Sequence, residues 1–224
     1  MGDAAVLDYA DMTLDELRLA IAPEVAASAI FDGWTETSLA NAAEMVGASP
    51  DVARLAFPGG AMDMIDAWIE RIDADMITAF PPERIATLKI RERIRDLVLF
   101  RLDAIAGLEE AVRRATAVMA MPQNAPGALR TGWRSADRMW RLAGDTATDY
   151  NHYTKRAMLA SIYGATLVIF IDDASEGKAE TRAFLDRRID GVMKFEQAKA
   201  KWLRGDRETF SVTRFLGRLR YPSN

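Results

Sequence analysis

Residues 33–57 read GWTETSLANAAEMVGASPDVARLAF and give the clearest indication of the fold. The pattern predicts two short helices, at 37–46 and 50–57, joined by a tight turn. Gly47 suits the end of the first helix, because glycine adopts the left-handed conformation of a C-terminal cap without strain. The Ser-Pro pair at 49–50 suits the start of the second, with serine as the N-cap and proline at the first helical position. The stretch therefore predicts a helix-turn-helix.

Helical signals continue on both sides of this stretch. Upstream, Thr13 and Glu16 form a capping box before an apolar face of Leu14, Leu17 and Ile21. Runs of alternating apolar and polar residues bounded by turn residues, which predict strands, are nearly absent. The sequence thus predicts an all-α protein of about ten helices. Further helices are expected at about 61–80, 84–106, 108–121, 128–142, 149–172, 179–203 and 208–220.

The composition limits the chemistry that the chain can perform. It holds no cysteine and one histidine among 224 residues, so neither a zinc site nor a di-iron carboxylate site is expected. The carboxylate pairs 109–110 and 172–173 read as a solvated helix face and a turn. No nucleophile, phosphate loop or dinucleotide motif is present. We therefore expect no metal, no cofactor and no catalytic activity.

Charge is distributed unevenly along the chain. Residues 1–80 hold three basic and fifteen acidic side chains, a net charge of −12. Residues 81–177 carry a net +2 and residues 178–224 a net +6. The acidic start shows no basic leader segment, and no stretch reaches the roughly 20 apolar residues of a membrane span. We expect a cytoplasmic bacterial protein, peripheral on the inner membrane.

A polar stretch interrupts the apolar second half. Residues 143–159 read AGDTATDYNHYTKRAML and include the single histidine and two adjacent cations. Residues 149, 152, 153 and 156 share one helix face by spacing. An aromatic flanked by an acid and an arginine suits a protein interface, whereas the alternative is a solvated helix start with an internal charge cluster. The candidate docking residues are Asp149, Asn151, His152, Tyr153, Lys155 and Arg156.

Apolar stripes surround that polar stretch at helical spacing. They suit an adaptable pocket for a lipid tail, although an ordinary core gives the same pattern. The candidate lipid-binding residues are Met139, Trp140, Met158, Leu159, Ile162, Tyr163, Thr166, Leu167 and Phe170.

The end of the chain is short, basic and amphipathic. Residues 208–220 place apolar side chains on one stripe and arginines opposite, which suits a helix lying on an anionic membrane. A last helix packed on the body is the alternative. The candidate membrane-contact residues are Val212, Arg214, Phe215, Leu216, Arg218 and Leu219.

Two family resemblances follow from these residues. The order of a long helix, GWTETSL, a short helix, VGASP and a short helix ending at Phe57 resembles the tetracycline-repressor family. The resemblance implies a helix-turn-helix head (1–80) and a helical ligand-binding and dimerisation body (81–206), with residues 207–224 as the amphipathic end. A repressor needs cations on its recognition helix, but PDVARLAF carries only Arg54. We expect no nucleic-acid partner, and a ligand-responsive regulator remains the alternative function.

The second resemblance is to the coenzyme Q biosynthesis protein nine family. It rests on AGD, TD, NxYTKRA and TRAFLDRRI within residues 140–192. It implies a dimeric accessory protein that binds isoprenoid quinone intermediates, contacts the membrane and presents the lipid to a demethoxyubiquinone hydroxylase. The family usually carries tryptophan where this chain has His152, so a smaller, titratable ring would retune that contact.

Overall fold

The computed structural model describes residues 9, 12–146, 148, 150–192 and 194. Within them the chain forms ten α-helices, nine of which are labelled α1 to α9, and one short 3-10 helix, with no strand, which confirms the predicted all-α class. Residues 179–192 form the tenth helix, at the end of the described part. The helices are α1 (Leu14–Asp32), α2 (Glu36–Val46), α3 (Pro50–Ala56), α4 (Ala61–Ala79), α5 (Pro82–Ala86), α6 (Ile90–Asp103), α7 (Glu109–Met119), α8 (Ala125–Leu142) and α9 (Tyr150–Asp172), with η1 (Glu176–Lys178) after them.

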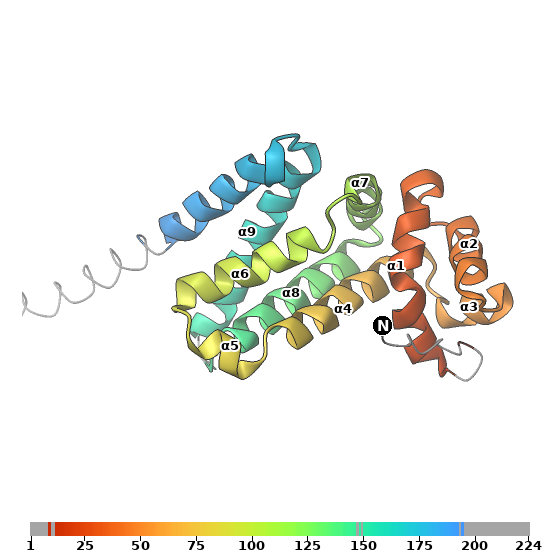
Figure 1. Cartoon of the computed structure of the whole chain (residues 1–224), viewed down its shortest axis with the longest axis horizontal. Coiled ribbons are helices and arrows are strands. Elements are labelled where there is room, and N and C mark those ends of the chain that lie inside the picture. The colour runs from red at the N-terminus through yellow and green to blue at the C-terminus, as the bar shows by residue number, and fades with distance from the viewer. Residues whose placement is uncertain (1–8, 10–11, 147, 149, 193, 195–224) are drawn as a thin grey trace, which may run out of the picture.

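The head, α1 to α3, follows the local rules read from its sequence (Figure 1). The capping box is present, with the Thr13 backbone N–H donating to Glu16 at 2.9 Å. Helix α2 starts one residue earlier than predicted, because the Thr35 hydroxyl accepts the Ser38 N–H at 3.3 Å and caps it. Gly47 ends α2 in the left-handed region, at a φ of 78°. Pro50 opens α3 as expected, while the Ser49 side chain makes no capping bond.

Head and body share one hydrophobic core rather than two. Helix α4 leaves the head and runs along α8 in the body, while α7 lies against α1 (Figure 1). The indole N–H of Trp34 donates to the Ala111 carbonyl at 3.0 Å, a buried bond from head to body. A single buried cluster extends from Leu17 to Ile189. The buried cluster therefore continues across residue 80, where the sequence places the boundary between head and body.

The long helix predicted at 84–106 is wrong, because the chain turns between α5 and α6. The guanidinium of Arg93 donates to the Leu88 carbonyl at 2.8 Å and to the Ala143 carbonyl at 2.9 Å, which fixes the turn against the end of α8. Glu92 accepts the Lys89 backbone N–H at 2.9 Å and starts α6. The helical spacing of apolar residues continues across the turn, so the sequence pattern alone does not predict the break.

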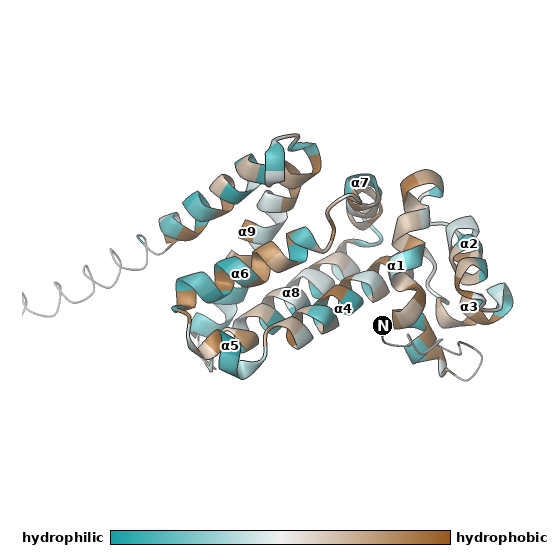
Figure 2. Ribbon diagram, in the orientation of Figure 1, coloured by the Kyte–Doolittle hydropathy of each residue, from teal (hydrophilic) through white to brown (hydrophobic). Residues whose placement is uncertain are grey.

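The last described helix, residues 179–192, packs on α6 through ion pairs. Arg91 and Arg95 of α6 each lie 2.6 Å from a carboxylate of this helix, Asp190 and Asp186 respectively. Figure 2 shows hydrophilic residues along much of its visible surface. The predicted helix 208–220, with the candidate membrane-contact residues Val212, Arg214, Phe215, Leu216, Arg218 and Leu219, lies outside the described residues.

Helix α9 corrects one expectation about membranes. Residues 151–172 are long and apolar enough to cross a membrane by length and composition, contrary to the sequence reading. The helix instead packs against α6, α7 and α8 within the bundle. Only 22% of its most apolar window is buried, so α9 keeps an exposed apolar face.

Candidate ligand-binding site

A cavity of about 380 Å³ lies between α4, α6, α7, α8 and α9. Its volume is in the range of small-molecule pockets, and its walls are predominantly apolar. Tyr163 and Leu167 from the predicted lipid-binding set line it. The remaining lining residues are Ile65, Trp68, Ile69, Ile72, Arg101, Ile105, Val112, Ala115, Thr116, Met119, Ala120, Thr131, Gly132, Ser135, Ala160 and Gly164.

Sequence reasoning missed the α4 and α7 walls of this cavity. Ile65, Trp68, Ile69 and Ile72 follow the i, i+3, i+4, i+7 spacing of a core-facing helix stripe. That signal was available, but it is the same for a stripe in a solid core and for one that lines a cavity. Only the placement of α4 opposite α8 and α9 shows that this stripe faces open space.

A ladder of charges between α4 and α8 lies beside the cavity, next to the lining residues Thr131 and Ser135 of α8. On α4, Asp66, Glu70 and Asp73 recur at i, i+4 and i+7, so they share one face. Arg134 of α8 pairs with Asp66 at 2.7 Å, and Arg138 pairs with Asp73 at 2.9 Å. Burial opposes ionisation of Asp66, but hydrogen bonds from Arg134 and Thr131 outweigh it and hold the pKa of that carboxyl below its usual value.

This ladder changes the interpretation of the acidic head. Three of the fifteen acidic residues at 1–80 lie on α4, and arginines of α8 neutralise their charge. Arg54, the only cation of the candidate recognition helix α3, is itself paired with Asp51 at 2.6 Å. The case against DNA binding therefore rests on the lack of available cations on α3, and less on the net charge of the first 80 residues.

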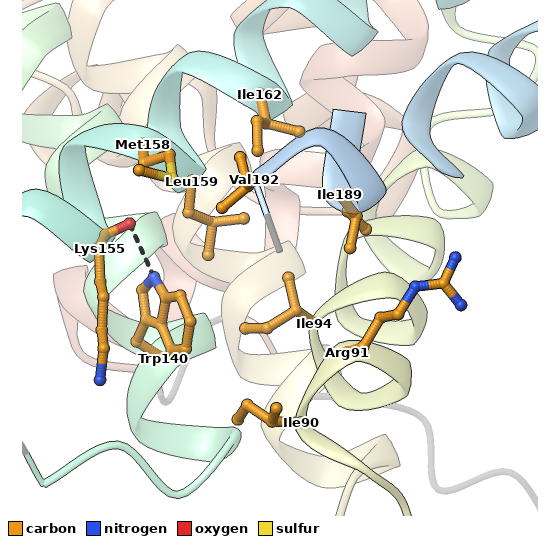
Figure 3. Close-up of a pocket in the computed structure, with 10 residues that line it drawn as sticks. All are labelled: Ile90, Arg91, Ile94, Trp140, Lys155, Met158, Leu159, Ile162, Ile189 and Val192. Atoms are coloured by element: carbon orange, nitrogen blue, oxygen red, sulfur yellow. Dashed lines mark hydrogen bonds between the residues drawn. The ribbon is translucent and has the colours of Figure 1, made fainter. Parts of the chain in front are cut away.

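A second, smaller pocket of about 60 Å³ lies where α6, α8, α9 and residues 179–192 meet (Figure 3). Four predicted lipid-binding residues line it, namely Trp140, Met158, Leu159 and Ile162. The Trp140 indole N–H donates to the Lys155 carbonyl at 2.9 Å, shown as the dashed line in Figure 3. A shallower groove continues from it, lined by Met158, Ile162 and the exposed Arg187 and Arg188.

The predicted lipid-binding set is thus divided between two places and the solid core. Met139, Thr166 and Phe170 are fully buried and line none of these pockets. The Thr166 hydroxyl is satisfied within α9, since it donates to the Ile162 carbonyl at 2.7 Å. For these three residues the structure favours the core interpretation that the sequence left open.

Arg156 is the main correction to the predicted docking surface. It is 1% exposed, so its side chain is unavailable to a partner. Its Nε lies 2.5 Å from Asp137, and its Nη1 lies 3.0 Å from Asp145 and 3.1 Å from the His152 carbonyl. Lys155 also pairs with Asp145, at 2.6 Å. The assumed shared face fails because α8 covers the side of α9 that carries Arg156.

The rest of the candidate docking set lies nearer the surface. Tyr153 is 61% exposed, His152 is half-buried and Asn151 is exposed. The rings of His152 and Tyr153 lie 5.1 Å apart, and Trp133 of α8 lies 6.0 Å from Tyr153. These three rings form an aromatic surface cluster, of which sequence reasoning missed Trp133. Asp149 lies outside the described residues.

The described residues contain no group of three or more histidine, cysteine, aspartate or glutamate side chains arranged to hold a metal ion.

The carboxylate of Asp173, expected in a turn, is a buried helix cap. It accepts Ser175 and Thr181 N–H groups, both at 2.8 Å. Burial opposes its ionisation, but these bonds and those from the two hydroxyls hold the pKa of Asp173 far below its usual range.

Fold and site define the class: an all-α protein built like the tetracycline-repressor regulators, with a mostly apolar cavity in its body. Among solved structures, the chain resembles the TetR transcriptional regulator from Nitrosomonas europaea ATCC 19718. The TM-score is 0.63 at 25% identity, over 78% of this chain and 97% of that one. The predicted repressor-like fold is confirmed.

The second resemblance is confirmed as well. The COQ9 family model matches residues 125–196, which span α8, α9 and the whole of the last described helix. Ubiquinone biosynthesis protein COQ9, mitochondrial, of Rattus norvegicus is 32% identical over 168 residues, which cover 72% of this chain and 54% of that protein. Its Homo sapiens counterpart is 30% identical, with 72% and 52% covered. The chain spans about half the length of these curated relatives. Their names place them in mitochondria and give no support to the expected bacterial location.

Proposed function

We propose that this chain is a lipid-binding accessory protein of ubiquinone biosynthesis with no chemistry of its own. The observation that carries the proposal is the mostly apolar cavity of about 380 Å³, whose α8 and α9 walls lie in the residues that the COQ9 family model matches. Helices α8 and α9, both inside the matched residues, supply the Gly132, Ala160 and Leu167 walls. An isoprenoid quinone intermediate is insoluble in water, so carrying its apolar parts out of a bilayer requires such a sleeve.

The decisive experiment extracts lipid from the purified full chain and identifies it by mass spectrometry. Gly132→Leu fills the cavity wall from a position where an added Cβ meets no atom within 4 Å. The matched control is Gly191→Leu, another helical glycine with open space, in the groove beside α9. We expect an isoprenoid quinone intermediate on the unaltered chain and on Gly191→Leu, and a large loss on Gly132→Leu. A lipid-free unaltered chain would overturn the proposal.

The aromatic surface cluster supports docking of a protein partner, for which we propose the demethoxyubiquinone hydroxylase. Exposed aromatic side chains on a rigid helix are common anchors of protein interfaces. The Arg156 network beneath fixes the start of α9 and so positions Tyr153. In a pull-down, Tyr153→Ala should lose hydroxylase capture. This change removes an exposed ring and leaves Tyr163, inside the body, in place. Unchanged capture by Tyr153→Ala would remove this part of the proposal.

A homodimer that contacts the membrane completes the proposal. The exposed side of α9 carries Ala157, Ser161, Ala165 and Val168, mostly small side chains that let a second helix approach closely. Two-fold symmetry would pair this face with itself. Arg187 and Arg188, exposed on the last described helix, suit anionic lipid headgroups. Analytical ultracentrifugation should give a dimer that Ala165→Glu dissociates, and vesicle flotation should require anionic lipid.

A ligand-responsive transcriptional regulator is the second candidate, because the similar solved structure is named as one. The pairing of Arg54 with Asp51 on α3 argues against it. A gel shift at low salt with DNA from upstream of the gene tests it. A specific complex that a ligand dissociates would favour this function over the first.

A further inference from the structure

Arg101 stands out among the residues that line the cavity. It is 1% exposed and lies on α6, where it meets an otherwise mostly apolar wall. Its Nη1–H donates to Asp73, and its guanidinium lies 5.0 Å from the centre of the Tyr163 ring. Its Nε–H has no hydrogen-bond partner among the described residues. Buried donors are rarely left unpaired, because each costs about 1–3 kcal/mol.

The carboxylate that neutralises Arg101 is shared. Asp73 also accepts from Arg138 at 2.9 Å and from the Ser135 hydroxyl at 3.3 Å. Glu70, 3.5 Å from Arg138, is the only further carboxylate paired with these cations in the described residues. Arg101 thus shares one carboxylate with Arg138, has the Tyr163 side chain as a further polar neighbour, and lines a cavity that is mostly apolar. This leaves it able to bind an additional oxygen atom.

The size of the cavity limits what that oxygen belongs to. An apolar cavity of about 150 Å³ holds one benzene molecule. A cavity of about 380 Å³ therefore accommodates a substituted ring and a short apolar extension, but not a long polyprenyl tail. Gly164 of the lining is exposed and Gly132 is half-buried, so the cavity reaches the surface beside these two glycines.

We infer that Arg101, with the Tyr163 ring beside it, binds an oxygen on the ring-sized polar head of an amphipathic ligand in this cavity. The apolar part of the head contacts the α4 and α7 walls, and any longer tail leaves past Gly164. The inference rests on the proposed function in taking the cavity as the ligand site. The shared chemistry is an acceptor oxygen on an apolar body, as in a quinone ring or a fatty carboxylate.

The test is calorimetric titration of the full chain with three probes. They are a ubiquinone with one isoprene unit, the corresponding prenylated benzene without oxygens, and decanoate. We expect the quinone to bind at least tenfold more tightly than the hydrocarbon, since hydrogen bonds to a charged group contribute about 1.5–3 kcal/mol. Decanoate binding tighter than the quinone would support the Arg101 contact and identify a carboxylate head.

Variants then locate the contact. Arg101→Lys keeps the positive charge near Asp73 but lacks the Nε–H and the planar fork. This variant should bind the quinone about tenfold more weakly and should leave the affinity for the hydrocarbon unchanged. Gly132→Leu should weaken binding of all three probes, and Gly191→Leu should weaken binding of none. Thermal denaturation checks that each variant is folded.

Two results would overturn the inference. One is equal affinity of the unaltered chain for the quinone and the hydrocarbon, which requires no variant and so does not depend on folding of Arg101→Lys. The other is unchanged quinone affinity in folded Arg101→Lys. If lipid extraction from the same chain nevertheless yields an isoprenoid quinone intermediate, the proposed function stands while the head-group contact fails. If extraction yields no lipid but the quinone probe binds through Arg101, the contact stands and the proposed function fails.

Discussion

Two buried arginines, Arg156 on α9 and Arg101 on α6, have the same exposure and opposite surroundings. Both are 1% exposed. Arg156 has two carboxylates and a backbone carbonyl within 3.1 Å, and it faces the packed interface of α8 and α9. Arg101 shares a single carboxylate, keeps an unpaired Nε–H and lines a cavity. Burial alone therefore does not separate a structural ion pair from a ligand contact. An unpaired donor alone does not either, since Arg134 also keeps an unpaired Nε–H while it pairs with Asp66, so the cavity beside Arg101 is the further difference.

The largest expected effect is the loss of the Arg156 network. Arg156→Leu leaves the Asp145 carboxylate, which is 5% exposed, with only Lys155 beside it. Breaking a buried pair by removing one partner costs about 3–5 kcal/mol, so we expect that loss of unfolding free energy in urea. The control is Arg141→Leu, which removes the 70% exposed partner of the same Asp137 and should cost at most about 1 kcal/mol. Equal losses would show that the buried network contributes nothing special.

Acid should act on the same network. Burial opposes ionisation of Asp145, but hydrogen bonds from Lys155 and Arg156 hold its pKa below the usual value, and the pKa of Asp137 is lowered in the same way. A lowered folded-state pKa contributes stability that is present above the unfolded value of about 3.9 and is lost as pH falls through the folded value. Denaturation at a series of pH values should show stability falling below about pH 4. The fall should be shallower in Arg156→Leu, and a parallel curve would contradict this origin.

Arg101→Leu sharpens the comparison from the other side. Asp73 keeps Arg138 and Ser135 as donors after this change, so it is not left unpaired. We expect a smaller loss of unfolding free energy than for Arg156→Leu, because Arg101 donates to one carboxylate whereas Arg156 donates to two carboxylates and a carbonyl. Urea denaturation of both variants under one condition measures the ratio. A loss as large as that of Arg156→Leu would place Arg101 among the structural residues.

The smallest effect on stability is expected at the surface above Arg156. Tyr153 is 61% exposed, so Tyr153→Ala should change the unfolding free energy by no more than about 0.5 kcal/mol. Its loss of hydroxylase capture would then reflect contact and not unfolding. Trp133→Ala, in the same cluster, should reduce capture as well. Capture that falls in step with thermal stability would instead make both residues structural.

The sequence was a good guide to helices and their ends. Thr13 with Glu16, Gly47 and Pro50 act where the pattern places them, because capping depends on groups within four residues of one another. It was a poor guide to the turn between α5 and α6. That turn is held by Arg93 reaching the Ala143 carbonyl, 50 residues away. The family resemblance also rested on short sequence motifs, within residues 140–192. The family match over residues 125–196 confirms it.

The site was only partly accessible to sequence reasoning. Of the predicted lipid-binding residues, Tyr163 and Leu167 line the cavity of the body, and Trp140, Met158, Leu159 and Ile162 line a neighbouring pocket. Arg101 and the α4 wall were missed, since a charged residue within an apolar helix reads as solvated. The acids of α4 counted only toward the net charge of the first 80 residues, yet Asp66 and Asp73 pair with arginines of α8.

By itself, the sequence determined the all-α class, the helix-turn-helix head and which face of each helix is apolar, because these follow from spacing within a single helix. The tertiary structure alone decided which faces meet. It sets Asp66 and Asp73 against Arg134 and Arg138, buries Arg156 and leaves Arg101 beside open space. These outcomes depend on the packing of helices distant in sequence, since the fate of a buried charge is fixed by the groups that surround it and not by its neighbours along the chain.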